Sequence, residues 1–142
     1  MTTTTYRTAA DGHSTAITAL RIAIVALTLA TAYIHATLGG LLFTLNAIGY
    51  TALALAMILP GPIGRARWLV RLALIGFTVA TIAGWLAFGA RFQLAYLDKA
   101  IEVGLVLATV VDLWHTDGNP LAIARRIRRL PSNVLAGLRT MA

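Results

Sequence analysis

Four long apolar stretches constrain the fold of this chain more than any other feature. They cover residues 22–36, 38–59, 68–90 and 101–114, and single polar residues are their only interruptions. A helix needs roughly 20 apolar residues to cross a bilayer. The second and third stretches reach this length alone, the first by extending back to Ser14 and the fourth by starting near Leu97. The sequence therefore predicts an all-α bundle of four transmembrane helices, spanning about 14–36, 38–59, 67–90 and 97–116.

Composition and the links between the spans agree with this prediction. The chain is 58% hydrophobic and 12% charged, whereas a soluble domain carries about 25% charged residues. Gly39 and Gly40 supply the backbone freedom that a tight reversal after the first span needs. The segment "PGPIG" after Leu59 ends the second span, because proline cannot continue a helix and glycine terminates one. Residues 1–13 are a polar tail, and no small-residue cleavage site precedes soluble sequence, so a cleavable signal peptide is a poor account of the N-terminus.

The placement of positive charge predicts the topology. The net charge is +7, and most of it lies before the first span, beside the link between spans two and three, and after the fourth span: Arg7, Arg21, Arg65, Arg67, Arg71, Arg125, Arg126, Arg128, Arg129 and Arg139. Cytoplasmic segments carry the excess of Lys and Arg. We therefore expect a multi-pass protein of the plasma membrane with both termini in the cytoplasm. The membrane topology accounts for the excess of basic residues, so a nucleic-acid partner is not needed to explain it.

The segment 117–142 is a basic cytoplasmic tail. Asn119 can cap a helix that begins at Pro120. Three apolar side chains would then share one face, and Arg125, Arg126, Arg128 and Arg129 would surround it. A short basic amphipathic helix of this kind binds anionic headgroups of the bilayer surface. The alternative is an extended positive anchor without a specific partner.

Two charged residues lie inside the predicted spans near their cytoplasmic ends. If the chain reverses around Arg91 and Phe92, then Arg71 and Asp112 fall at almost the same depth. An ionised group that faces lipid is costly, and such groups usually pair or face the interior. We expect a structural Arg71–Asp112 ion pair, which we favour over a functional role.

Four polar residues in the outer half form a candidate ligand or proton site. His35 ends the first span, Asn46 and Tyr50 lie four apart on one face of the second, and Glu102 lies in the fourth. A cavity lined by these residues would open outward and bind a small polar ligand, or pass a proton between His35 and Glu102. In the alternative, Asn46 and Tyr50 bond across helices as packing contacts, His35 lies among headgroups, and Glu102 pairs with Lys99.

No cofactor, metal site or catalytic residue is expected from the sequence motifs. The chain has no cysteine, which excludes disulfides and thiolate ligands. A bis-histidine haem needs two ligands at one depth, but His13 and His115 lie at the inner side and His35 at the outer side. There is no H-E-x-x-H motif and no nucleophile elbow. An intramembrane enzyme is therefore the least favoured class.

A motif spans the end of the first span and the second span, with the pattern His35-x-x-Leu38-Gly39-Gly40-x-x-Phe43-x-x-Asn46-x-x-Gly49-Tyr50. It resembles a pattern of small, uncharacterised four-helix membrane proteins of GC-rich bacteria. The resemblance covers the first two spans. It implies the four-span fold and draws attention to His35, Asn46 and Tyr50, and it implies no activity.

The sequence favours a non-catalytic accessory or interaction subunit of a membrane complex. The chain is small, and Gly76, Ala80 and Gly84 recur every four residues along the third span, where they offer a close face for a partner helix or a second copy of the chain. The alternative is a small transporter or ligand-binding membrane protein that uses the outer polar residues.

Overall fold

The described part of the protein consists of four α-helices. The computed structural model describes residues 5–61, 64, 66–118 and 125. The helices are α1 (Thr5–Leu38), α2 (Leu41–Ile58), α4 (Arg67–Phe88) and α5 (Gln93–Asp117), and these described residues contain no strand. The all-α prediction is confirmed. Helix α1 begins at Thr5 rather than near Ser14, and the predicted amphipathic helix of the basic tail lies outside the described residues.

Three of the four helices are long and apolar enough to cross a membrane. They are the segment Thr15–Leu38 of α1, the whole of α2 and the whole of α4. Helix α5 is long enough to cross a membrane but carries more charge than the other three helices. Any stretch of membrane-spanning length within it includes several of its charged residues: Asp98, Lys99, Glu102, Asp112 and Asp117. Residues 5–118, apart from 62, 63 and 65, therefore form an all-helical bundle with three candidate membrane spans.

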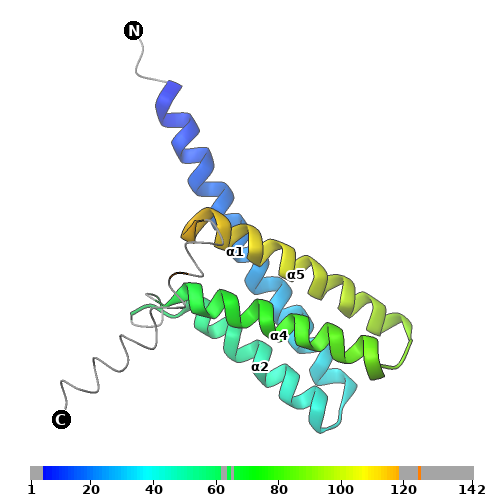
Figure 1. Ribbon diagram of the computed structural model, residues 1–142. Helices are drawn as coiled ribbons and strands as arrows, with labels where there is room; N and C mark the ends of the chain where they lie inside the picture. The colour runs from blue at the N-terminus through cyan, green and yellow to red at the C-terminus, as the bar shows by residue number, and fades with distance from the viewer. Residues whose placement is uncertain (1–4, 62–63, 65, 119–124, 126–142) are drawn as a thin grey trace, which may run out of the picture.

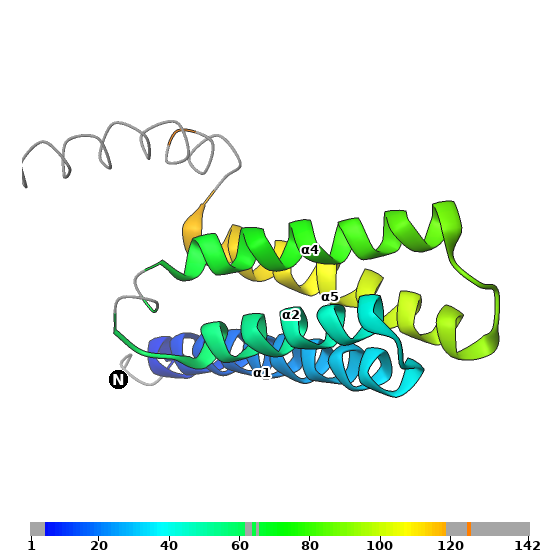
Figure 2. The ribbon, with the colours of Figure 1, turned by 90° about the horizontal axis from the view of Figure 1, so that it is seen from below.

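The four helices form a closed ring in the order α1, α2, α4, α5. Each helix packs against the next and α5 returns to α1. Among the described residues, the backbones of the diagonal pairs do not approach closely, but Tyr50 of α2 reaches Glu102 of α5 through its side chain. The α1–α2 and α4–α5 turns lie at one end of the bundle, and the α2–α4 link lies at the other (Figures 1 and 2). At the α1–α2 turn, Gly39 and Gly40 have φ angles of 70° and 85°, which glycine adopts without steric cost. We call this end of the bundle the turn end.

Gly49 lets α2 and α4 approach each other closely. A Cβ atom at this position would lie 2.6 Å from Phe77 Cζ on α4. The Phe77 ring in turn packs edge-on against Tyr50, with 4.9 Å between ring centroids. This contact helps to place Tyr50 in the bundle core.

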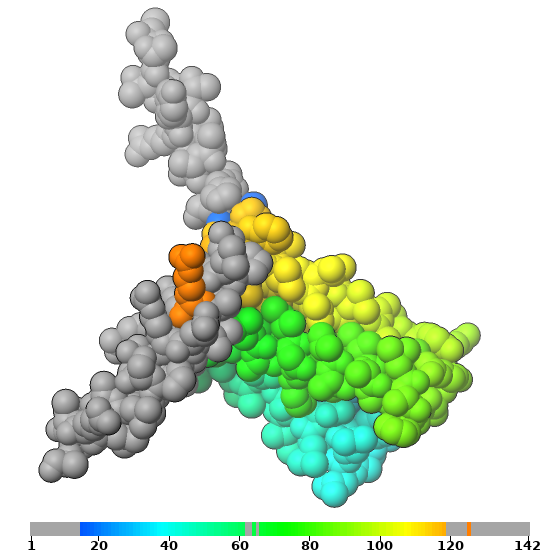
Figure 3. Space-filling model, viewed as in Figure 1, coloured from blue at the N-terminus to red at the C-terminus, as the bar shows by residue number. Residues whose placement is uncertain are grey.

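The bundle has polar groups inside and large apolar side chains outside. Arg71, Asp98, Glu102 and Asp112 are each at most 2% exposed, whereas Phe88 is 93% exposed. Helix α5 follows the same rule, because its outward side chains are apolar: Leu97, Val103, Leu107, Val110, Val111 and Trp114. Figure 3 shows α5, α4 and α2 side by side on one such face. An apolar surface of this extent is typical of a lipid-facing bundle.

Candidate functional site

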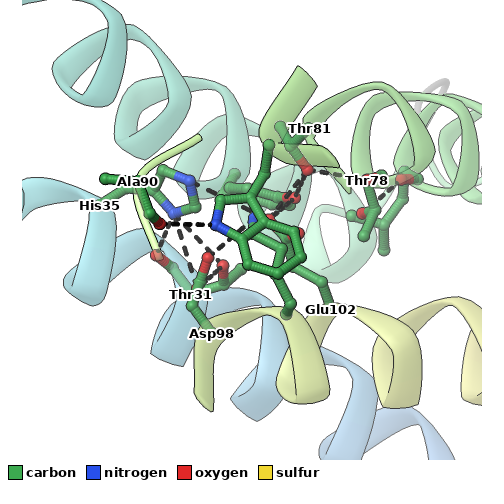
Figure 4. Close-up of polar contacts among 11 residues, drawn as sticks. Thr31, His35, Thr78, Thr81, Ala90, Asp98 and Glu102 are labelled. Atoms are coloured by element: carbon green, nitrogen blue, oxygen red, sulfur yellow. Dashed lines mark hydrogen bonds and ion pairs between the residues drawn. The ribbon is translucent and has the colours of Figure 1, made fainter. Parts of the chain in front are cut away.

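Four ionisable residues meet at the turn end, and we call them the His35 cluster: His35, Asp98, Lys99 and Glu102. His35 lies in the last turn of α1, whereas the other three lie in the first turns of α5. Asp98 and Glu102 are four residues apart and therefore share the face of α5 that packs on α1. Three of these side chains, those of His35, Asp98 and Glu102, are almost fully buried. Figure 4 shows His35, Asp98 and Glu102 converging from the two helices.

Lys99 links the two carboxylates of the cluster. Its Nζ atom lies 3.0 Å from Asp98 Oδ2 and donates a short hydrogen bond to Glu102 Oε2. His35 lies on the other side, with Nδ1 3.8 Å from Asp98 Oδ1 and Nε2 4.0 Å from Glu102 Oε1. Two carboxylates and one ammonium sum to one negative charge while the imidazole is neutral. The cluster therefore carries one net negative charge, which favours the approach of a cation.

The imidazole of His35 is held in one orientation. Its Nδ1 atom lies 2.9 Å from the backbone oxygen of Thr31, and a carbonyl oxygen can only accept, so Nδ1 carries a proton. Among the described residues, Nε2 makes no hydrogen bond, and it faces Glu102. In a neutral ring Nε2 therefore presents its lone pair toward Glu102, whereas the protonated Nδ1 lies 3.8 Å from Asp98 Oδ1.

Hydroxyl groups hold both carboxylates in place. Thr31 Oγ1 donates to Asp98 Oδ1 at 2.6 Å. Tyr50 donates to Glu102 Oε1 at 2.8 Å, and Thr81 Oγ1 lies 2.9 Å from the same oxygen. Because Tyr50 comes from α2 and Thr81 from α4, all four helices contribute to this one set of polar contacts (Figure 4).

A cavity of about 400 Å³ lies beside the cluster. His35, Asp98 and Lys99 are among the residues that line it, together with Asn46. Its remaining walls are largely apolar and come mainly from α2, α4 and the α4–α5 turn: Leu42, Phe43, Phe77, Ala80, Gly84, Trp85, Phe88 and Phe92. Trp85 is fixed by a hydrogen bond to Ala90 O, and the Arg91 guanidinium lies 4.2 Å from its ring centroid.

The four residues of the predicted ligand or proton site occupy two layers. His35 and Asn46 line the cavity, whereas Tyr50 and Glu102 are fully buried beneath it. The Glu102 carboxylate is enclosed by its bonds to Tyr50, Thr81 and Lys99, which is why it does not reach the cavity wall. Tyr50 and Glu102 are therefore not among the residues that line this cavity, although Glu102 Oε1 lies 4.0 Å from His35 Nε2. The amide of Asn46 makes no hydrogen bond with any described residue.

Asp98, Thr31 and Thr81 belong to the site, and sequence reasoning had not assigned them to it. The four-residue spacing of Asp98 and Glu102 was the available signal for the first. Thr31 and Thr81 carry no such signal, because threonine is common in these helices and usually bonds to the carbonyl four residues earlier, as Thr28 does.

A second charged cluster lies toward the opposite end of the bundle. Arg71 Nε donates to Asp112 Oδ2 at 2.6 Å, and Arg21 Nε donates to Asp112 Oδ1 at 3.1 Å. Arg71 also reaches Asp117 Oδ2 at 3.0 Å. The structure therefore brings the predicted pair together and adds Arg21 and Asp117 to it. Every charge in this network has a partner, which is the arrangement of a structural ion network.

Comparison of the chain with protein-family models, with curated proteins and with solved structures finds no match.

Proposed function

We propose that this chain is a four-span protein of the plasma membrane that binds a small amphipathic molecule in the cavity at the turn end. The observation that carries the proposal is a largely apolar cavity with ionisable groups at one wall. Ligand pockets usually combine apolar walls with a few polar groups that orient the ligand. An apolar ligand body would contact Phe43, Phe77 and Trp85, and a polar group would contact Asn46 and Lys99.

The unpaired amide of Asn46 supports a ligand with a hydrogen-bonding group. An amide without a hydrogen bond in an apolar environment costs free energy, and polar side chains in membrane spans usually find partners. Asn46 has no partner among the described residues and lines the cavity. A bound polar group would remove that cost.

Leucine at Gly84 is expected to block ligand binding. Gly84 lines the cavity, and a Cβ atom built there meets nothing within 4 Å, so the larger side chain would occupy the cavity rather than disturb packing. Purified protein would be extracted with organic solvent, and the released molecules quantified by mass spectrometry. The amount of any molecule retained by the wild type should be at least about tenfold lower in Gly84→Leu, which corresponds to a loss of about 1.4 kcal/mol in binding free energy.

Gly76→Leu is the matched control. Gly76 lies eight residues earlier on the same helix face, also meets nothing within 4 Å, and does not line the cavity. Gly76→Leu should retain the molecule at the wild-type level. Equal retention by Gly84→Leu and the wild type, or no retained molecule in the wild type, would count against a ligand-binding function.

The four-span arrangement with both termini in the cytoplasm is part of the same proposal. The apolar outer face and buried charges of α5 support it as the fourth span, and the positive-inside rule supports the orientation. Because the chain has no cysteine, single exposed cysteines can report on topology. An impermeant thiol reagent on intact cells should label Gln93→Cys in the α4–α5 turn region and leave Pro60→Cys unlabelled. The reverse pattern would reject this orientation.

An accessory or interaction subunit is the second candidate function. Gly76, Ala80 and Gly84 are exposed on α4, and small residues at this spacing allow another helix to approach closely. Co-purification in mild detergent followed by mass spectrometry tests this candidate. Loss of a partner in Gly76→Leu, with the small molecule retained, would favour the interaction function over the binding function.

A further inference from the structure

The His35 cluster offers three ligand groups of the kinds that transition-metal ions bind. His35, Asp98 and Glu102 are all buried, and one ligand atom from each lies within 4.8 Å of the others. Bonds from zinc to nitrogen and carboxylate oxygen are about 2.0–2.2 Å long, so two ligand atoms of a tetrahedral ion lie roughly 3.4 Å apart. The three groups therefore need to approach one another by roughly 1–1.5 Å to share an ion.

Each of the three groups also makes a hydrogen bond to a neighbouring residue that orients it, as metal ligands in proteins usually do. A histidine that binds a metal typically donates its other ring N–H to a carbonyl or carboxylate, and His35 Nδ1 donates to Thr31 O at 2.9 Å. Thr31 Oγ1 donates to Asp98, and Tyr50 donates to Glu102. This leaves His35 Nε2, which lies 4.0 Å from Glu102 Oε1, as the ring nitrogen with a free lone pair.

We infer that the His35 cluster binds one divalent transition-metal ion through His35 Nε2, Asp98 and Glu102. Mixed imidazole and carboxylate ligands suit ions such as Zn²⁺, Co²⁺ or Mn²⁺, whereas Ca²⁺ and Mg²⁺ prefer oxygen ligands alone. The cavity gives access to the site, because His35 and Asp98 line it. The inference is independent of the amphipathic ligand proposed above.

In the metal-free protein, the ammonium of Lys99 supplies the positive charge that a bound metal ion would otherwise supply to the two carboxylates. Its ammonium bonds to both carboxylates, and its side chain lines the cavity and is 11% exposed. If Lys99 moves into the cavity when the ion binds, two carboxylates then balance one divalent ion. The metal-bound site is neutral, whereas the Lys99-bound site with neutral His35 carries one negative charge. Metal binding thus improves the charge balance of a buried site.

Metal titration of the full chain in detergent, after removal of metal with a chelator, tests the inference. Isothermal calorimetry with Zn²⁺ and visible absorption with Co²⁺ are the probes. We expect one ion per chain, and Co²⁺ absorption bands that report nitrogen and oxygen ligands in the bound state. His35→Gln should weaken Zn²⁺ binding at least about 100-fold, at the upper end of the losses seen for changes near metal sites.

The matched control is His115→Asn, which removes a histidine at the opposite end of α5 and should leave the affinity unchanged. Asp98→Asn keeps the side-chain shape, so it tests the site even if His35→Gln fails to fold, and it should also weaken Zn²⁺ binding at least about tenfold. Absence of saturable binding in the wild type would overturn the inference. Equal weakening by His115→Asn and His35→Gln, or wild-type affinity in Asp98→Asn, would overturn it as well.

Discussion

Leucine in place of Asp112 is expected to lower the free energy of unfolding by about 3–5 kcal/mol, the usual cost of breaking a buried ion pair. Asp112 is fully buried and accepts hydrogen bonds from Arg71 and from Arg21. Its removal leaves Arg71, which is 2% exposed, with Asp117 as its remaining acidic partner. A buried guanidinium that loses the closer of its two carboxylate partners is only partly compensated, which is costly in an apolar interior.

Arg71→Leu alone should cost less than Asp112→Leu, because Asp112 would keep Arg21 as a partner. The double variant Arg71→Leu with Asp112→Leu should be more stable than Asp112→Leu alone, since it also removes the buried guanidinium that Asp117 alone would otherwise balance. Thermal unfolding in detergent, followed by circular dichroism, provides the comparison. Losses that simply add in the double variant would reject the coupling between the two residues.

Asp117→Leu is the matched control for this series. Asp117 is an aspartate of the same helix that also contacts Arg71, but it lies at the end of α5 and its side chain is 12% exposed. Asp117→Leu should lower the thermal stability clearly less than Asp112→Leu does. An equal loss would mean that the cost comes from any change in the network rather than from the buried carboxylate.

The positions of the helices and the depth of charged residues follow from the sequence. Apolar length and the glycines at 39 and 40 mark where helices begin and end. Equal distance from the α4–α5 turn places Arg71 and Asp112 at one depth, and their atoms lie 2.6 Å apart in the structure. Depth is predictable because rise per residue in a helix is constant.

Rotation of each helix about its axis could not be derived in the same way. Apolar residues surround these helices on most sides, so the sequence pattern does not distinguish the face toward lipid from the face toward the bundle. The role of Asp98 depends on this rotation, because its carboxylate accepts a hydrogen bond from Thr31 of α1 and also lines the cavity beside Lys99. The cavity itself depends on which small residues of α4 stand opposite Asn46, and depth alone does not determine that.

Methionine in place of Lys99 is the second change with a large expected effect. Without the ammonium, Asp98 and Glu102 would leave two negative charges in a buried site, so the melting temperature with a chelator present should fall by on the order of 10 °C. Adding Glu102→Gln restores the wild-type sum of one negative charge and should recover most of the loss. Lys99→Arg is the charge-preserving control and should remain closer to the wild type. If the double variant is no more stable than Lys99→Met, the charge balance of the His35 cluster does not account for the loss. Packing by the lysine stem would then be what stabilises the turn end.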